Sequence, residues 1–417
     1  MSCRKKVVYI SSRPPFPKIA GREFMICQSL EFLTSKYDVY FVCFLGRNQS
    51  VDKDKISNLG ILSSYYLNTS SFFRFVYNVI LFRNKSLQEC LYYSPSGKKF
   101  LDNAIANINP DVIICDMLRT SQFVDDSDVL VTDLDDLLSN RYENMLRSNS
   151  NYSVLGTYAQ RLPKVFSQCE KLLRKILLSY ECKKIRESEK RIYSKSNKVI
   201  LTSPIEAEHI NTIYHSDKAT GVPQAVDCSE LEFSDGIIKK LLFIGNMTTA
   251  QNIESLRFIV KEVLPELIKV TKNFEIVVVG KYDERLNEII FGVENKVKLL
   301  GFVDDLKAVA SGCSVALMPV AFGTGIKTKV LDSMALGLPT ITNDVGIEGI
   351  NAVHGEDLIV CKTPADIAGS VCELLSSKKL SRQLSNNGLS FIKNNHSKKI
   401  LCNKYLSVID NVARRDM

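Results

Sequence analysis

Two glycines and two lysines stand close together in a stretch whose spacing suits the binding of a phosphate group. Gly323 and Gly325 allow backbone N–H groups to come close to a ligand, because glycine has no Cβ and tolerates unusual backbone angles. A helix predicted to begin near Thr324 or Lys327 directs the positive end of its dipole toward the same place. Lys327 and Lys329 add two full positive charges. The spacing therefore predicts an anion-binding turn between a strand and a helix.

Asp332 adds a carboxylate to this stretch, which spans 319–342. It lies one turn inside the predicted helix, where a carboxylate accepts hydrogen bonds from sugar or ribose hydroxyls. Gly337 and Pro339 end the helix, and the residues that follow read as the next strand. A simpler interpretation stays open, since Lys329 and Asp332 are three residues apart and such pairs form ordinary ion pairs on helices.

A second group of polar residues follows a predicted strand in the first half of the chain. Asp133, Asp135 and Asp136 stand there, with Arg141 five residues beyond the last of them. A D-x-D pattern can hold a divalent cation, and Asp residues after strands often cap helices. Because the glycine turn and its lysines lie in the other half, we expect these acids to orient substrate hydroxyls or to pair with Arg141. We expect no metal cofactor.

Short apolar runs predict the strands that must position these residues, and helix-length segments separate the runs. Such continuous runs are typical of parallel strands that are buried on both faces. The pattern predicts two doubly wound α/β halves with ligands at the carboxyl ends of the strands. The first series comprises 7–11, 39–45, 112–115, 129–132 and 198–202; the second comprises 241–245, 275–280, 297–301, 314–318, 339–342 and 358–361.

The length of 417 residues is enough for two or three domains that each bury a core. Periodicity lapses near 215–238, where Gly, Pro, Asp and Ser gather, and this predicts the join. We therefore divide the chain into a first domain at 1–220, a second at 221–395 and a helical end at 396–417.

The glycine–lysine stretch also resembles a known family pattern, G-x-G-x-K-x-K-x-L-D/E followed by A-x-G-x-P. Every element is present, as Gly323, Gly325, Lys327, Lys329, Leu331, Asp332, Ala335, Gly337 and Pro339. This stretch resembles the donor-binding segment of GT-B glycosyltransferases, especially members of glycosyltransferase family 4 that make bacterial surface polysaccharides. Four further segments are similar to family elements and occur in the same order, at 7–22, 131–142, 241–256 and 299–306.

The resemblance implies a retaining glycosyltransferase of the GT-B fold, with two Rossmann-like domains facing across a cleft. It also implies that the C-terminal helix at 396–417 packs back on the N-terminal domain. It would move a sugar from a UDP- or GDP-sugar, held by the second domain, to a lipid-linked or growing glycan acceptor, held mainly by the first. The implied catalytic residues are Lys327, Lys329 and Asp332, and the implied donor-binding residues are Gly245, Asn246, Gly323, Thr324, Gly325, Ile326 and Glu348. The implied acceptor-side residues are Gly21, Arg22, Asp133, Asp135, Asp136 and Arg141.

The sequence departs from the family pattern in three ways. The first of the two family glutamates is replaced by Thr324, so a contact to the donor sugar is expected from its hydroxyl. No Arg and Lys follow Gly245, where Asn246 and other uncharged residues stand instead. Asp116 occupies the place of the frequent cleft histidine, and we name no general base. These departures leave two alternatives open, a nucleotide-sugar epimerase of the same architecture and a catalytically silent membrane-attached scaffold.

The positive charge of the chain is concentrated in residues 161–198. This window holds 12 Lys or Arg against 4 Glu. Its net charge therefore equals the formal net charge of the whole protein, +8. Basic and apolar residues alternate there as on a helix that lies on an anionic membrane surface, and 71–83 could supply an aromatic partner. A solvated basic face is the alternative. No helix-turn-helix, KH or RNP-type pattern accompanies the charge, so we expect no nucleic-acid partner.

The 12 cysteines include no C-x-x-C pair, which argues against a zinc site and a disulfide framework. No apolar run is long enough to span a membrane or to read as a secretory signal. We therefore expect a cytoplasmic protein that binds peripherally to the inner face of the cell membrane.

Overall fold

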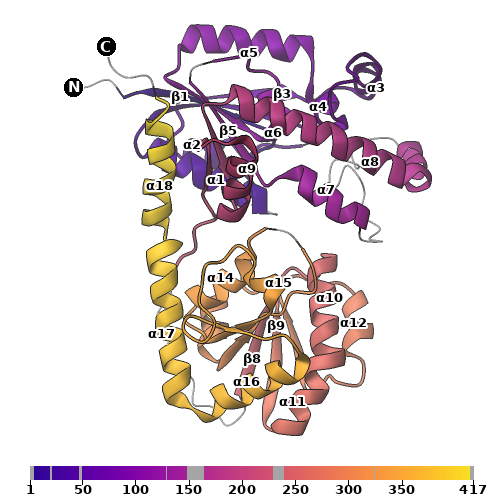
Figure 1. The fold of residues 1–417 in the computed structure, drawn as a ribbon, viewed down its shortest axis with the longest axis vertical. Coiled ribbons are helices and arrows are strands. Elements are labelled where there is room, and N and C mark those ends of the chain that lie inside the picture. The colour runs from indigo at the N-terminus through magenta and orange to yellow at the C-terminus, as the bar shows by residue number, and fades with distance from the viewer. Residues whose placement is uncertain are drawn as a thin grey trace. The chain divides into compact units, whose positions relative to one another are not determined.

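The computed structural model describes residues 4–18, 21–46, 49–127, 129–147, 164–228, 239–323 and 325–413, with the backbone alone at 147 and 164–174. The chain divides into two compact units (Figure 1). Unit 1 comprises Met1–Gln224 and Cys402–Met417, and unit 2 comprises Ala225–Leu401.

Unit 1 is built on a seven-stranded sheet in the order β3-β2-β1-β4-β5-β6-β7, with all neighbouring strands parallel. The strands are β1 Lys6–Ser11, β2 Asp38–Leu45, β3 Ser63–Asn68, β4 Val112–Asp116, β5 Leu130–Asp135, β6 Lys198–Leu201 and β7 Ala219–Gly221. Every residue of β4 is buried, as expected for a strand with both faces covered. The two strands that the apolar runs miss, β3 and β7, are the edge strands, and β3 has no buried residue.

The helices of unit 1 connect these strands. They are α1 Gly21–Thr34, α2 Lys53–Ser57, α3 Phe72–Leu81, α4 Leu87–Tyr92, α5 Pro95–Ile108, α6 Met117–Ser121, α7 Leu138–Arg147, α8 Lys164–Lys195 and α9 Pro204–Tyr214.

Unit 2 is built on a six-stranded parallel sheet in the order β10-β9-β8-β11-β12-β13. The strands are β8 Lys239–Ile244, β9 Phe274–Val279, β10 Val297–Gly301, β11 Val315–Leu317, β12 Thr340–Thr342 and β13 Ile359–Val360. Its other elements are α10 Ala250–Phe258, η2 Ile259–Val263, α11 Leu264–Val270, α12 Arg285–Ile290, α13 Leu306–Ser311, α14 Thr328–Ala335, α15 Asp344–Ile347, α16 Pro364–Ser376 and α17 Lys378–Asn395, and α18 Lys398–Asp410 leads back into unit 1. In Figure 1, α10 and α12 cover one face of this sheet and α14 and α17 the other. Two doubly wound α/β halves are thus confirmed.

The unit boundaries fall a few residues after the predicted positions of 220 and 395. Gly221 belongs to unit 1 because it pairs with Leu201 as the last residue of β7. At the other end, α18 belongs to unit 1 from Cys402 onward. Tyr405 packs there against Phe32, with the ring centroids 5.9 Å apart.

Candidate functional site

In unit 2 the predicted phosphate-binding turn lies where the strand order reverses. β8 and β11 are neighbours in the sheet, yet the chain passes from β8 to β9 and from β11 to β12 on opposite sides. The segments that follow β8 and β11 therefore diverge at the carboxyl edge, and ligands bind at such points in open α/β sheets. Gly245 and Asn246 follow β8, and the glycine turn follows β11.

Close backbone approach requires glycine at two places near this edge. Gly280 has φ +136°, and a Cβ atom there would lie 1.8 Å from the carbonyl oxygen of Gly245. Gly323 has φ +135°, and a Cβ atom there would lie 2.6 Å from the Nε2 atom of Gln251 on α10. The glycine turn therefore packs directly against the start of α10, and no larger residue fits at Gly323 without a shift.

The rest of the turn is held by its neighbours. Gly325 has φ +72° with open space where a side chain would be, and the half-buried Ile326 packs against the core of unit 2. The backbone N–H of Val320 donates to Asn343 Oδ1 at 3.0 Å. Thr324 lies outside the described residues.

Lys329 is a buried cation on the first turn of α14. Its Nζ donates to Asn252 Oδ1 at 3.0 Å and lies 5.1 Å from the centre of the Phe243 ring. Burial, and then the charge of Lys327, lower the pKa of Lys329 from 10.5 to about 8. No carboxylate of the described residues pairs with Lys329. A buried cation without a carboxylate partner is unfavourable unless an anion comes to it, and such perturbed groups cluster at functional sites.

Lys327 is the N-cap residue of α14 and is also buried. Its Nζ donates to the carbonyl oxygen of Gly325 and lies 3.5 Å from Glu348 Oε2. The Glu348 side chain is about half exposed, so this ion pair offsets little of the buried charge. The structure thus brings Lys327, Lys329 and Glu348 to one edge of the sheet.

Asn246 and Asn252 support Lys329 from the other side of the turn. The backbone oxygen of Asn246 accepts from Asn252 Nδ2 at 3.0 Å, which turns the Asn252 carbonyl oxygen toward Lys329. The sequence does not predict Asn252 as a site residue, because it precedes Lys329 by 77 positions and carries no charge. The one signal in the sequence is position, since Asn252 lies in the first turn of the helix that follows β8, three residues after Thr249.

Asp332 lies on α14 beyond the two lysines. Its carboxylate forms no hydrogen bond or ion pair with the residues that the structure describes, and burial alone raises its pKa from 3.8 to about 7. An unpartnered carboxylate on this helix fits the predicted role of accepting hydroxyl groups of a ligand.

The raised pKa of Asp332 makes the stability of unit 2 depend on pH. The folded state binds the Asp332 proton more tightly than the unfolded state, so this residue lowers the free energy of unfolding progressively from about pH 4 to about pH 7. We expect Asp332→Asn to be more stable than the parent at pH 7.5 and equally stable at pH 4. Urea unfolding at both pH values measures this, with Asp304→Asn, a change at an exposed acid, as the control. Equal pH dependence in the parent and Asp332→Asn would contradict the raised pKa of the carboxylate.

In unit 1 the equivalent edge holds a buried ion cluster. β1 and β4 are the strands at the reversal point there. Arg22, in the first turn of α1 that begins at Gly21, points inward and binds Asp116 at the end of β4 through two nitrogens. It also lies 3.2 Å from a carboxylate oxygen of Asp133 and 3.3 Å from one of Asp135, both of β5.

The pKa values of Asp116 and Asp133 are shifted in opposite directions. Burial would raise the pKa of Asp116, but the Arg22 charge and hydrogen bonds from Ser12 hold it below its ordinary value. Burial raises the pKa of Asp133 above its ordinary value, despite the Arg22 charge. Asp135 has φ +67°, an uncommon value for a residue other than glycine, so the end of β5 is strained.

Asp136 and Arg141 form the ion pair that the sequence suggests. Burial raises the pKa of Asp136, and its Oδ1 is buried without a hydrogen-bond partner in the described part of the chain. The acceptor-side residues predicted from sequence thus form a cluster around Arg22 and a neighbouring pair. The sequence does not predict Asp116 as the main partner of Arg22, because 94 positions separate them.

The basic window 161–198 falls mostly on α8. Its residues 161–163 lie outside the described residues, as do the side chains of Lys171 and Arg174. From Leu178 onward α8 buries one face against unit 1, whereas Lys175 and Ile176 are exposed. Over the described parts of the chain, no helix has both the length and the apolar character needed to cross a membrane.

Comparison with known proteins finds a family model that matches the domain with the two lysines. Residues 238–377 match the family described as glycosyl transferases group 1. This chain is a glycosyltransferase. A Klebsiella pneumoniae protein, described as an uncharacterized 44.6 kDa protein in the cps region, is 21% identical to the chain over 406 residues. The match covers 94% of this chain and 97% of that relative.

Solved structures share the fold of this glycosyltransferase over nearly its whole length. Sucrose-phosphate synthase from Thermosynechococcus elongatus has a TM-score of 0.67 at 13% identity, covering 98% of this chain and 99% of that one. HepE from Anabaena, solved with UDP, has a TM-score of 0.66 at 11% identity, covering 97% and 100%. The predicted GT-B fold is therefore confirmed.

Proposed function

We propose that this glycosyltransferase moves a sugar from a UDP- or GDP-sugar to a lipid-linked or growing glycan acceptor, with retention of the anomeric configuration. The observation that carries the proposal is the pair of buried lysines at the edge of unit 2. Lys329 has no carboxylate partner among the described residues, and beside it the buried Lys327 lies 3.5 Å from the half-exposed Glu348. A diphosphate bound at this edge would supply the negative charge that Lys329 lacks.

The proposed chemistry relies on charge stabilisation. When the sugar leaves, negative charge grows on the diphosphate, and the ammonium groups of Lys327 and Lys329 are fixed where they can neutralise it. Backbone N–H groups of the glycine turn and the N-terminus of α14 add to this field. Asp332 accepts hydroxyl groups of the nucleoside, and the cluster around Arg22 in unit 1 serves the acceptor. The acceptor hydroxyl loses its proton to a phosphate oxygen in this scheme, so no protein base is required.

The relatives support the biological context of the proposal. HepE has been solved with UDP and with UDP-glucose, which supports a nucleotide-sugar donor. The Klebsiella relative comes from the cps region, which supports a role in bacterial polysaccharide synthesis, as capsule, exopolysaccharide or O-antigen. We place the chain in family 4 on the pattern between Gly323 and Pro339.

A donor assay tests the proposal. The purified protein is incubated with a panel of UDP- and GDP-sugars and a lipid-linked acceptor mixture. We expect release of UDP or GDP that depends on the acceptor. An isomerised donor without nucleotide release would instead identify an epimerase. Nucleotide-sugar turnover by neither route would favour the catalytically silent scaffold.

We propose that the reaction needs no metal. Because Lys327 and Lys329 neutralise the diphosphate, we expect transfer activity to persist after dialysis against EDTA, at a rate within about twofold of the untreated enzyme. Asp135→Asn should not introduce a requirement for Mn²⁺. Loss of activity in EDTA with recovery on addition of Mn²⁺ would overturn this part of the proposal.

We also propose that the enzyme acts on the inner face of the cell membrane, with residues 161–198 against the anionic surface. The support is the excess of 12 basic over 4 acidic residues in that window, since each basic residue near such a surface contributes about 1 kcal/mol. The exposure of Lys175 and Ile176 is compatible with it.

A further inference from the structure

Helix α3 presents its apolar side chains to solvent. Six of its ten residues are exposed and apolar, while the two buried ones are Phe75 and Asn78. The exposed set comprises Phe72, Phe73, Val76, Tyr77, Ile80 and Leu81. A surface helix of a soluble protein normally buries its apolar face and exposes polar residues. Here Phe73 is 84% exposed and Ile80 is 69% exposed, so the helix carries an apolar outer face.

Buried hydrogen bonds hold α3 in this orientation. Asn78 donates from Nδ2 to the carbonyl oxygens of Cys90 at 2.9 Å and Tyr93 at 2.8 Å. An amide that makes two buried bonds costs free energy to remove, so rotation that would turn the apolar face inward is opposed. The outward position of the apolar face is therefore built into the packing of α3 on α4.

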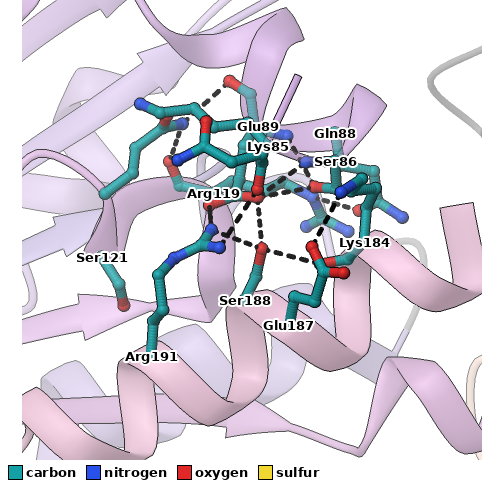
Figure 2. A network of polar contacts seen from close by, with 12 residues as sticks. Lys85, Ser86, Gln88, Glu89, Arg119, Ser121, Lys184, Glu187, Ser188 and Arg191 are labelled. Carbon is teal, nitrogen blue, oxygen red and sulfur yellow. Dashed lines mark hydrogen bonds and ion pairs between the residues drawn. The ribbon is translucent and has the colours of Figure 1, made fainter. Parts of the chain in front are cut away.

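A polar network joins this region to the long helix α8 (Figure 2). Glu89 of α4 accepts from Ser188 Oγ at 2.6 Å and from Arg191 at 3.3 Å, and both residues reach up from α8. Arg191 also donates to the carbonyl oxygen of Asn84, in the connection that follows α3. The carboxylate of Glu181 accepts the first backbone N–H groups of α4. These bonds fix the segment that carries α3 to the basic helix.

The charged residues of the chain segment that contains α3 are of one sign. Between Lys55 and Gln88 the chain contains Arg74, Arg83 and Lys85 and no Asp or Glu. Arg74 lies over the Tyr77 ring, 5.5 Å from its centre. Aromatic and aliphatic side chains flanked by cations match the interface of an anionic bilayer, where rings settle at the level of the headgroups.

We propose that α3 inserts its apolar face into the headgroup–acyl boundary of an anionic lipid bilayer. This goes beyond the transfer reaction and holds whether or not the donor assignment is right. The helix lies in the plane of the membrane and does not cross it, since about 20 apolar residues are needed to span and α3 has ten. The basic window of α8 supplies long-range attraction, and α3 supplies the inserted contact.

A single tryptophan tests the insertion, because the protein contains none. Phe73→Trp places a fluorescent reporter on the apolar face, and Phe291→Trp places one at a phenylalanine of unit 2 with matched exposure of 83%. With vesicles of phosphatidylglycerol and phosphatidylcholine, we expect a blue shift of emission and quenching by brominated acyl chains for Phe73→Trp. Phe291→Trp should show neither.

Two variants with serine in place of apolar residues complete the test by measuring vesicle binding. Phe73→Ser/Ile80→Ser should lower the partition coefficient onto the same vesicles at least tenfold, whereas Phe291→Ser should leave it unchanged. Thermal unfolding of each variant checks that the fold persists. An unchanged Phe73→Trp spectrum on protein that sediments with vesicles would overturn the proposal. So would a dimer of the parent in sedimentation velocity that Phe73→Ser/Ile80→Ser dissociates, because the apolar face would then bind a second copy.

Discussion

Replacing Arg22 by methionine should lower the free energy of unfolding of unit 1 by about 3–5 kcal/mol, because it leaves buried carboxylates without their cation. Arg22 binds Asp116 and contacts Asp133 and Asp135, and its side chain is only 5% exposed. Methionine fills much of the same volume, so the expected loss comes from charge and not from a cavity. Urea unfolding followed by far-ultraviolet circular dichroism measures it.

Lys36→Met is the matched control for this change. Lys36 also pairs with an aspartate of unit 1, Asp410, but both side chains are nearly half exposed. Exposed pairs contribute about 0–1 kcal/mol, so the control should lose little. Arg22→Lys should not restore the stability of the parent, because an ammonium group cannot bind several carboxylates with the geometry of a guanidinium group. Equal losses in Arg22→Met and Lys36→Met would show that the cluster around Arg22 contributes no more than a surface pair.

The second large effect concerns donor binding. Lys329→Ala and Lys327→Ala should each weaken the binding of a nucleoside diphosphate by about 1.5–3 kcal/mol, roughly 10- to 150-fold, because each removes a charge-assisted contact to phosphate. Turnover should fall at least as much, since the charge on the leaving group grows during the reaction. Lys261→Ala, at an exposed lysine of η2, is the control and should match the parent.

Asn252→Ala tests how Lys329 is positioned. It removes the carbonyl oxygen that Lys329 Nζ donates to at 3.0 Å but keeps the charge. We expect a smaller loss of diphosphate affinity than in Lys329→Ala. A loss equal to that of Lys329→Ala would assign Asn252 a direct contact with the ligand.

The sequence predicts most of the sheet architecture, because parallel strands buried on both faces appear as continuous apolar runs. All six strands of unit 2 fall within or beside such runs, as do five of the seven in unit 1. The apolar runs do not predict β3 and β7, which are edge strands with one neighbour each. In β3 the side chains are also only partly buried or exposed. The end of the first domain shifts from 220 to 224 for a related reason, since β7 is recognised only by its pairing with β6.

The sequence predicts the candidate site only where the site residues are close together in the chain. Gly323, Gly325, Lys327 and Lys329 are close together in the chain, so their spacing already indicates an anion site. The support of Lys329 by Asn252 and the binding of Arg22 to Asp116 are contacts between distant segments, which exist only once the strands are ordered in the sheet. The perturbed pKa values of Lys329 and Asp332 likewise arise from burial, which the sequence pattern does not quantify.

The central claim is that the two lysines of unit 2 bind the diphosphate of a nucleotide-sugar donor. Calorimetric titration of the parent and of Lys327→Ala/Lys329→Ala with UDP, with GDP and with the free nucleosides tests it most directly. The account predicts that one of the diphosphates binds the parent and binds the double variant at least 100-fold more weakly, while the affinity for its nucleoside changes by less than about twofold. Equal affinity of the parent and the double variant for both diphosphates would contradict it.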